Sequence, residues 1–105
     1  MRCLANGFEG GTTTILKGAD TTLQIVVMED TGEDMSDGTL TAKFYEADNR
    51  SGTSFSISIT SGELLIEADN SDINYNTTYY VYVELEVPGY GGTYVSQTPF
   101  AVQVK

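Results

Sequence analysis

The stretch Thr-Thr-Tyr-Tyr-Val-Tyr-Val-Glu-Leu-Glu-Val, residues 77–87, is the strongest structural signal in this sequence. Apolar side chains occupy every second position, namely Tyr79, Val81, Val83, Leu85 and Val87. The intervening positions carry Tyr80, Tyr82, Glu84 and Glu86. A period of two places the two sets on opposite faces of an extended chain, one face buried and one solvated. The stretch therefore predicts a long β-strand in the second half of the chain.

The same alternation recurs on both sides of this strand. The sequence predicts further strands at residues 12–17, 21–28, 39–47, 54–60, 64–67 and 93–104, separated by turns rich in Gly, Asp, Asn and Ser. The side chains expected to face inward are Leu23, Ile25, Val27, Leu40, Ala42, Phe44, Phe55, Ile57, Ile59, Phe100, Val102 and Val104. No segment shows helical periodicity over ten residues.

About seven short strands predict an all-β fold, an immunoglobulin-like two-sheet antiparallel β-sandwich, with a closed barrel as the alternative. One inward face alone supplies too little core, so two sheets must pack together. We expect one domain at residues 12–105, preceded by an N-terminal arm at residues 1–11 with no regular alternation. A tyrosine corner, a feature of immunoglobulin-like domains near the start of the penultimate strand, would use Tyr79 or Tyr75.

Charge and composition exclude several functional classes. The 105 residues carry 15 Asp plus Glu against 5 Lys plus Arg, a formal net charge of -10. This excess of negative charge disfavours binding to nucleic acid or to an anionic membrane. The sequence has no His and a single Cys, so His-based catalytic dyads and an internal disulfide are absent. The N-terminus has no apolar run of signal-peptide length, so export by such a signal is not expected.

Two acidic or amide-rich turns raise the question of a Ca²⁺ site. The first contains Glu29, Asp30, Glu33, Asp34 and Asp37, of which Asp30, Asp34 and Asp37 are the weak calcium candidates. The second contains Asp69, Asn70, Asp72 and Asn74. Calcium prefers oxygen ligands, but the spacing differs from an EF-hand loop. We interpret both segments as solvated turns, and we predict no cofactor.

Catalysis is disfavoured for related reasons. Paired carboxylates serve glycosidases, yet any acidic turn contains such pairs, and a small sandwich leaves little room for a substrate cleft. Cys3 precedes the first predicted strand and has no His to activate it. The sequence predicts a protein that is not an enzyme.

Exposed aromatic and apolar side chains are the candidate binding residues. Tyr80 and Tyr82 point away from the expected core, and Tyr90 and Tyr94 flank a glycine-rich turn. Tyrosine can stack on sugars or anchor a protein interface, and it can also support an open sheet face. In the N-terminal segment, Leu4 and Phe8 are candidate docking anchors, with a frayed terminus as the alternative.

Four segments resemble one family. Gly18–Val27, Gly38–Phe44, Asn76–Val83 and Thr98–Val104 are similar to strands of the phage baseplate-upper-protein N-terminal domain, and together the likeness covers residues 12–105. The resemblance is to this immunoglobulin-like family or to a related virion decoration module.

This resemblance implies a non-enzymatic phage virion structural protein: a capsid decoration, a head fibre, or a tail or baseplate accessory. Its partners would be other virion proteins, capsid or tail subunits, bound in multiple copies or as homo-oligomers, with no nucleic acid and no membrane. It would be located in the virion, assembled in the host cytoplasm. Unpaired strand edges offer one docking mode. The alternative function is a carbohydrate-binding or adhesin module that uses Tyr80, Tyr82, Tyr90 and Tyr94.

Overall fold

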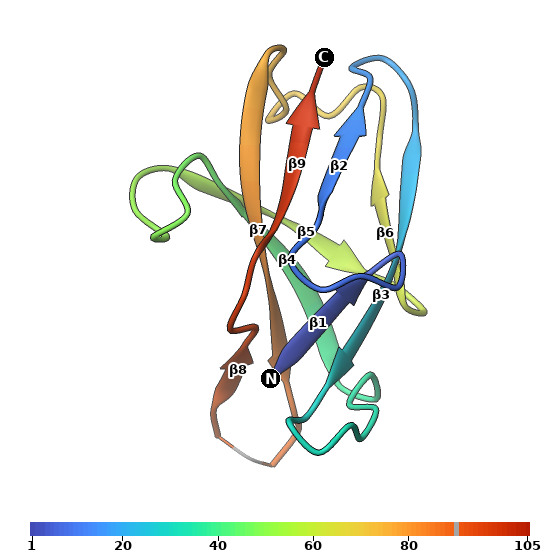
Figure 1. Cartoon of the computed structure of the whole chain (residues 1–105), viewed down its shortest axis with the longest axis vertical. Coiled ribbons are helices and arrows are strands. Elements are labelled where there is room, and N and C mark those ends of the chain that lie inside the picture. The colour runs from blue at the N-terminus through green and yellow to red at the C-terminus, as the bar shows by residue number, and fades with distance from the viewer. Residues whose placement is uncertain (90) are drawn as a thin grey trace.

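The computed structural model describes residues 1–89 and 91–105, and the described residues form an all-β sandwich of two sheets (Figure 1). The strands are β1 (Arg2–Ala5), β2 (Thr12–Ile15), β3 (Thr21–Met28), β4 (Thr39–Tyr45), β5 (Ser54–Ile59), β6 (Glu63–Ile66), β7 (Thr77–Glu86), β8 (Thr93–Val95) and β9 (Phe100–Val104). One sheet has the order β1-β3-β6. The other has the order β2-β9-β7-β4-β5, and β8 pairs with β7. The predicted immunoglobulin-like β-sandwich is confirmed.

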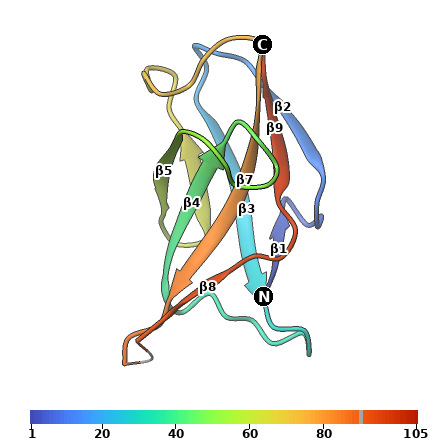
Figure 2. The ribbon, with the colours of Figure 1, turned by 90° about the vertical axis from the view of Figure 1, so that its left-hand side faces the viewer.

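The long strand predicted at residues 77–87 is β7, and it is central to the larger sheet. β7 pairs antiparallel with β4 on one side and with β9 on the other (Figure 2). Tyr79, Val81, Val83 and Leu85 are buried, as the alternation predicted. Val87 lies just beyond the strand and is only partly buried. The inward faces of β3, β4 and β9 are likewise confirmed.

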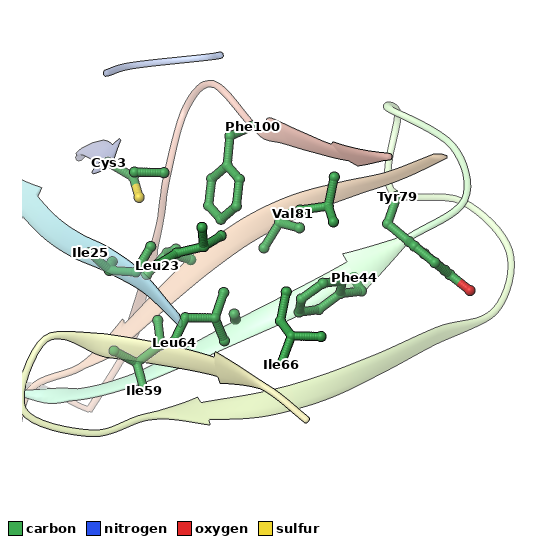
Figure 3. Close-up of a cluster of buried hydrophobic side chains, with 14 of the residues drawn as sticks. Cys3, Leu23, Ile25, Phe44, Ile59, Leu64, Ile66, Tyr79, Val81 and Phe100 are labelled. Carbon is green, nitrogen blue, oxygen red and sulfur yellow. The ribbon is translucent and has the colours of Figure 1, made fainter. Parts of the chain in front are cut away.

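The core lies between the sheets, where side chains from both layers meet (Figure 3). Phe44 of β4 stacks on Phe55 of β5 with ring centroids 4.8 Å apart, and the ring of Tyr79 meets Phe55 edge-on at 5.4 Å. Leu23, Ile25 and Leu64 from the smaller sheet are also fully buried. Phe55 and Ile57 are only half-buried, because β5 is the outermost strand of its sheet.

Two predictions about strand arrangement need correction. The sandwich is not wholly antiparallel, because β2 runs parallel to β9, with Thr12 opposite Ala101. The chain reaches β2 from β1 in the other sheet, so no tight hairpin sets the direction of β2. The predicted strand at 93–104 divides into β8 and β9. Between them, Ser96 interrupts the ladder: its Oγ accepts a hydrogen bond from the Val83 N–H at 3.0 Å.

The N-terminal arm was also predicted wrongly. Residues 2–5 form strand β1, which pairs antiparallel with β3 and buries Cys3 and Ala5. The pattern was missed because only two small apolar residues alternate there. Gly10 and Gly11 then lead the chain across to the second sheet, so the segment is part of the sandwich.

The tyrosine corner is present at Tyr79. Its hydroxyl accepts a hydrogen bond from the Asn74 N–H at 3.0 Å and donates one to the Asp72 carbonyl at 3.3 Å. These bonds tie the segment that crosses between the sheets, residues 67–76, to the start of β7. Tyr75, the alternative, is 63% exposed. No helix long and apolar enough to cross a membrane occurs in the part of the chain that the structure describes.

Candidate functional site

The N-terminal hairpin, defined as residues 2–8, is the candidate docking site. Asn6 and Gly7 have positive φ values of 51° and 85°, which suits the two-residue turn that Asn-Gly favours. The Ala5 N–H donates to the Phe8 carbonyl at 2.8 Å, and the Phe8 N–H donates to the Ala5 carbonyl at 3.1 Å. The turn therefore closes tightly and fixes the backbone of Phe8.

This hairpin is also attached to the sandwich. The Asn6 N–H donates to the Gln24 carbonyl at 2.8 Å, and the Gln24 N–H donates to Asn6 Oδ1 at 2.8 Å. Arg2 and Glu9 form an exposed ion pair, with Nε and Oε2 at 2.9 Å. The bonds to Gln24 hold the turn in register with β3, so Phe8 is presented from a supported backbone.

Phe8 is the most exposed large hydrophobic residue among those described, with 73% of its surface accessible. It borders a cleft of about 370 Å³ between the hairpin and β2. The cleft is lined by Ala5, Asn6, Phe8, Glu9, Gly11, Thr12, Thr13 and Phe100. An exposed aromatic ring beside an open cleft can be buried by a partner's apolar side chains.

Leu4, the second predicted anchor, lies on the outer face of the smaller sheet. Its neighbours Cys3 and Ala5 point into the core. Leu4 is half-buried and lies beside Val26, its cross-strand partner on β3. Val26 is itself 36% exposed. The structure thus places Leu4 and Phe8 on one hairpin, and the signal that locates this hairpin is the Asn-Gly pair between Ala5 and Phe8.

The predicted tyrosine surface is only partly exposed. Tyr82 faces away from the core, as expected, but only 9% of it is accessible. Its hydroxyl donates to the Asp48 carbonyl at 2.5 Å, the Arg50 guanidinium lies 5.2 Å from its ring centroid, and Tyr45 meets the ring edge-on at 5.9 Å. The expectation that Tyr82 is available to a partner is therefore wrong. The turn after β4 folds over it.

Two of the other predicted tyrosines, Tyr80 and Tyr94, are also only partly exposed. Tyr80 is half-buried on β7. Tyr94 is half-buried on β8 and packs against the core. Tyr90 lies outside the described residues. A sugar-stacking surface needs open aromatic rings, and Tyr80, Tyr82 and Tyr94 are less open than that role requires. The carbohydrate-binding alternative stays a prediction.

The acidic turns do not gather into a metal site. Residues 1–89 and 91–105 contain no group of three or more His, Cys, Asp or Glu side chains placed to hold an ion, so Asp30, Asp34 and Asp37 form no cluster. Asp34 Oδ1 accepts the Ser36 N–H at 2.9 Å. Hydrogen bonds from the side chain and backbone of Ser36 lower the pKa of Asp34.

In the second polar turn, at residues 69–74, polar groups form hydrogen bonds with nearby residues. Asn70 Oδ1 accepts the Asp72 N–H at 2.9 Å, and the Asn74 N–H donates to Tyr79. These side chains and backbone groups shape turns.

Cys3 has the environment of a core residue. Burial, followed by the negative charge of Glu9, raises the pKa of its thiol to about 12. At neutral pH the thiol is protonated and enclosed, and such a group is a poor nucleophile.

Comparisons with protein-family models, with curated proteins and with solved structures find no match for this chain.

Proposed function

We propose that this chain is a non-enzymatic structural protein of a phage virion, which attaches to other virion proteins through its N-terminal hairpin. The resemblance of four strand segments to the baseplate-upper-protein N-terminal domain supports the virion role. The observation that carries the docking site is Phe8, an aromatic side chain that is 73% exposed although its backbone is fixed by a closed turn.

A fixed, exposed aromatic side chain is an efficient anchor. Because the turn is already ordered, binding costs little backbone entropy, and burying the ring removes apolar surface from water. Aromatic anchors at interface centres typically contribute about 2 kcal/mol or more, which corresponds to about thirtyfold in Kd. The half-buried Leu4 and its neighbour Val26 add apolar surface on the outer face of the smaller sheet.

The chemistry of the chain also favours a protein partner. Its net charge of -10 disfavours the phosphate backbone of nucleic acid and the anionic surface of a membrane. Capsid or tail subunits are repeated in a particle, so the protein would be bound in multiple copies, as a capsid decoration, a head fibre, or a tail or baseplate accessory. It would join the virion in the host cytoplasm.

The strain that carries the gene for this chain is the host. The test uses phage particles that this host produces after the gene has been deleted, so the particles lack the chain. Purified particles are mixed with the wild-type protein, with Phe8→Ala or with Leu16→Ala, and then sedimented. Leu16 is 62% exposed, so Leu16→Ala removes a comparable exposed apolar side chain elsewhere. We expect the wild type and Leu16→Ala to co-sediment, and Phe8→Ala to bind about thirtyfold more weakly.

Two results count against the proposal. Failure of the wild-type protein to bind the particles, together with its absence from wild-type virions by mass spectrometry, would exclude the virion role. Equal binding of Phe8→Ala and wild type would exclude the hairpin as the docking site. Imaging the bound protein then distinguishes the head from the tail.

A further inference from the structure

β5 is an edge strand without the usual protection against pairing. It is the last strand of the larger sheet (Figure 2) and, at six residues, is longer than the edge strands β1, β2 and β6. Residues 51–62 contain no charged residue and no proline. Natural proteins generally place charge, proline or a very short strand at an open edge. β1 carries Arg2, and β6 begins with Glu63.

The hairpin turn between β5 and β6 indicates which backbone groups of β5 point outward. The Thr60 N–H donates to the Glu63 carbonyl at 3.0 Å, and the Glu63 N–H donates to the Thr60 carbonyl at 2.9 Å. These groups of Thr60 point away from β4. Because alternate residues of a strand direct their backbone groups to the same side, those of Ser54, Ser56 and Ser58 also point to the open edge.

We propose that a second copy of this chain pairs with β5, antiparallel and across a two-fold axis at Ser56. In this register Ser56 faces the partner's Ser56, and Ser54 faces the partner's Ser58. Each of these pairs exchanges backbone hydrogen bonds, so every outward N–H and C=O of the three serines is satisfied in both copies. The two larger sheets then form one continuous sheet.

The side chains also match under this symmetry. Phe55 lies opposite the partner's Ile57 on the core side, and both are half-buried in the single chain. Aromatic and β-branched residues form favourable cross-strand pairs. The serine side chains meet on the outer face, where small polar groups create no steric or charge conflict.

Charge favours this edge for contact between two copies. Each chain carries a net charge of -10, so two copies repel one another over most of their surfaces. Residues 51–62 form a neutral strip, so two copies of this strip can approach with no carboxylate on either one. At the Ser54 end, a cleft of about 330 Å³ lies between β5 and the segment at 71–74, and the acidic residues that line it are Glu46 and Asp72.

Shifted registers satisfy fewer groups. A shift by two residues in one direction brings Ser54 opposite the partner's Thr60, whose backbone groups are already bonded to Glu63. The opposite shift brings Ser58 opposite Gly52, which lies outside β5 at a positive φ of 81°. Centring on Ser56 is therefore the favoured register.

The first test measures self-association by sedimentation equilibrium from about 10 μM to about 1 mM, because a contact limited to one strand edge is small. Since salt screens the repulsion between acidic copies, we expect dimerisation to strengthen as NaCl rises from about 0.02 M to about 0.3 M. Ser56→Glu brings two carboxylates together at the axis, and we expect at least about a tenfold weaker dimer.

Thr14→Glu is the matched control, because it adds the same charge at an exposed position on the opposite edge strand, β2. We expect it to dimerise like the wild type. Loss of the dimer in Thr14→Glu but not in Ser56→Glu would assign the contact to β2 and overturn the proposal. A wild-type protein that stays monomeric throughout the concentration and salt range would also overturn it, leaving the β5 edge for a strand of another protein.

The second test reads the register from cross-linking and does not depend on Ser56→Glu being folded. In an antiparallel hydrogen-bonded pair the Cα atoms are about 5.5 Å apart, a separation that a disulfide or a short bis-maleimide can bridge. Ser56→Cys should therefore cross-link to itself. Ser54→Cys and Ser58→Cys should cross-link to each other when mixed, and much less when each is alone.

The wild-type protein, whose thiol is Cys3, measures the background of the cross-linking experiment. Cys3 is buried with its pKa raised to about 12, so wild type should not cross-link. Cross-linking of Ser56→Cys that is no faster than that of Thr14→Cys would refute the two-fold at Ser56. Neither test involves the virion, so the outcome is independent of the proposed function.

Discussion

Removing the hydroxyl of Tyr79 tests whether the tyrosine corner stabilises the sandwich. In Tyr79→Phe the ring is retained, with its edge-on contacts to Phe44 and Phe55 at centroid distances of 6.0 and 5.4 Å. What is lost is the acceptor for the Asn74 N–H at 3.0 Å and for the Asn74 side-chain amide at 3.4 Å, together with the donor to the Asp72 carbonyl at 3.3 Å. The substitution therefore isolates the hydrogen bonds from the packing.

The magnitude follows from the two bonds to backbone groups, since the bond from the Asn74 side-chain amide is the longest of the three. A net contribution of about 0.5–1.5 kcal/mol for each hydrogen bond, with some cost for leaving part-buried backbone groups without a partner, gives a loss of about 2 kcal/mol. Urea denaturation measures it directly. With an m-value of about 2 kcal/mol/M, the midpoint falls by about 1 M while the slope is unchanged.

Tyr75→Phe is the matched control, because Tyr75 is 63% exposed and precedes the same strand. Its free energy of unfolding should stay within about 0.5 kcal/mol of the wild type. If Tyr79→Phe also stays within that range, or if Tyr75→Phe costs as much as Tyr79→Phe, then the corner does not hold the segment at 67–76 and the reasoning is refuted.

Further predictions concern packing and the buried thiol. Gly38→Ala should destabilise the fold by about 2 kcal/mol or more, because its Cβ would collide with Leu85 and lie 2.7 Å from the Glu86 carbonyl oxygen. Gly92→Ala is the control, because a Cβ there meets nothing within 4 Å, and it should change the free energy of unfolding by less than about 0.5 kcal/mol. Equal losses of stability for Gly38→Ala and Gly92→Ala in urea denaturation would contradict this prediction. Cys3 should resist a thiol reagent at pH 8 until denaturant is added, and rapid labelling of the folded protein would show that the thiol is accessible. Folding raises the pKa of Cys3 from 9.0 to about 12. The buried thiol therefore contributes fully to the free energy of unfolding below pH 9. This contribution is lost as pH rises toward 12, because the unfolded chain releases the proton first. The wild type should therefore lose more stability over this range than Cys3→Ala does, as measured by urea denaturation at each pH.

The sandwich was predictable because burial on one face imposes a period of two on the sequence. Val81, Val83 and Leu85 alternate with polar or aromatic residues for that reason, and the structure buries all three. β1 lacked such a pattern, since Cys3 and Ala5 are small and only two positions alternate. The better signal there was local: Asn6-Gly7 adopts the positive φ values that a two-residue hairpin needs.

Exposure on the outer face could not be predicted from alternation. The period of two places Tyr82 on the side away from the core, and it lies there. Whether that side is open to solvent depends on the turn after β4. There the Asp48 carbonyl accepts a hydrogen bond from the Tyr82 hydroxyl, and the Arg50 guanidinium covers the Tyr82 ring. These contacts join residues more than thirty positions apart in sequence, so no local pattern reports them. The buried state of Cys3 was hidden for the same reason.

The two proposed contacts lie on opposite margins of the sandwich. β1 is at one end of the smaller sheet and β6 at the other, and a tight turn joins β6 to β5. A dimer formed through β5 therefore leaves both Phe8 side chains free at its outer margins. On a particle built from repeated subunits, binding of one hairpin would raise the effective concentration of the second to about the millimolar range where the spacing allows both to engage. If both proposed contacts form, weak single contacts would suffice for stable attachment, because two Phe8 side chains would act together on the repeated surface.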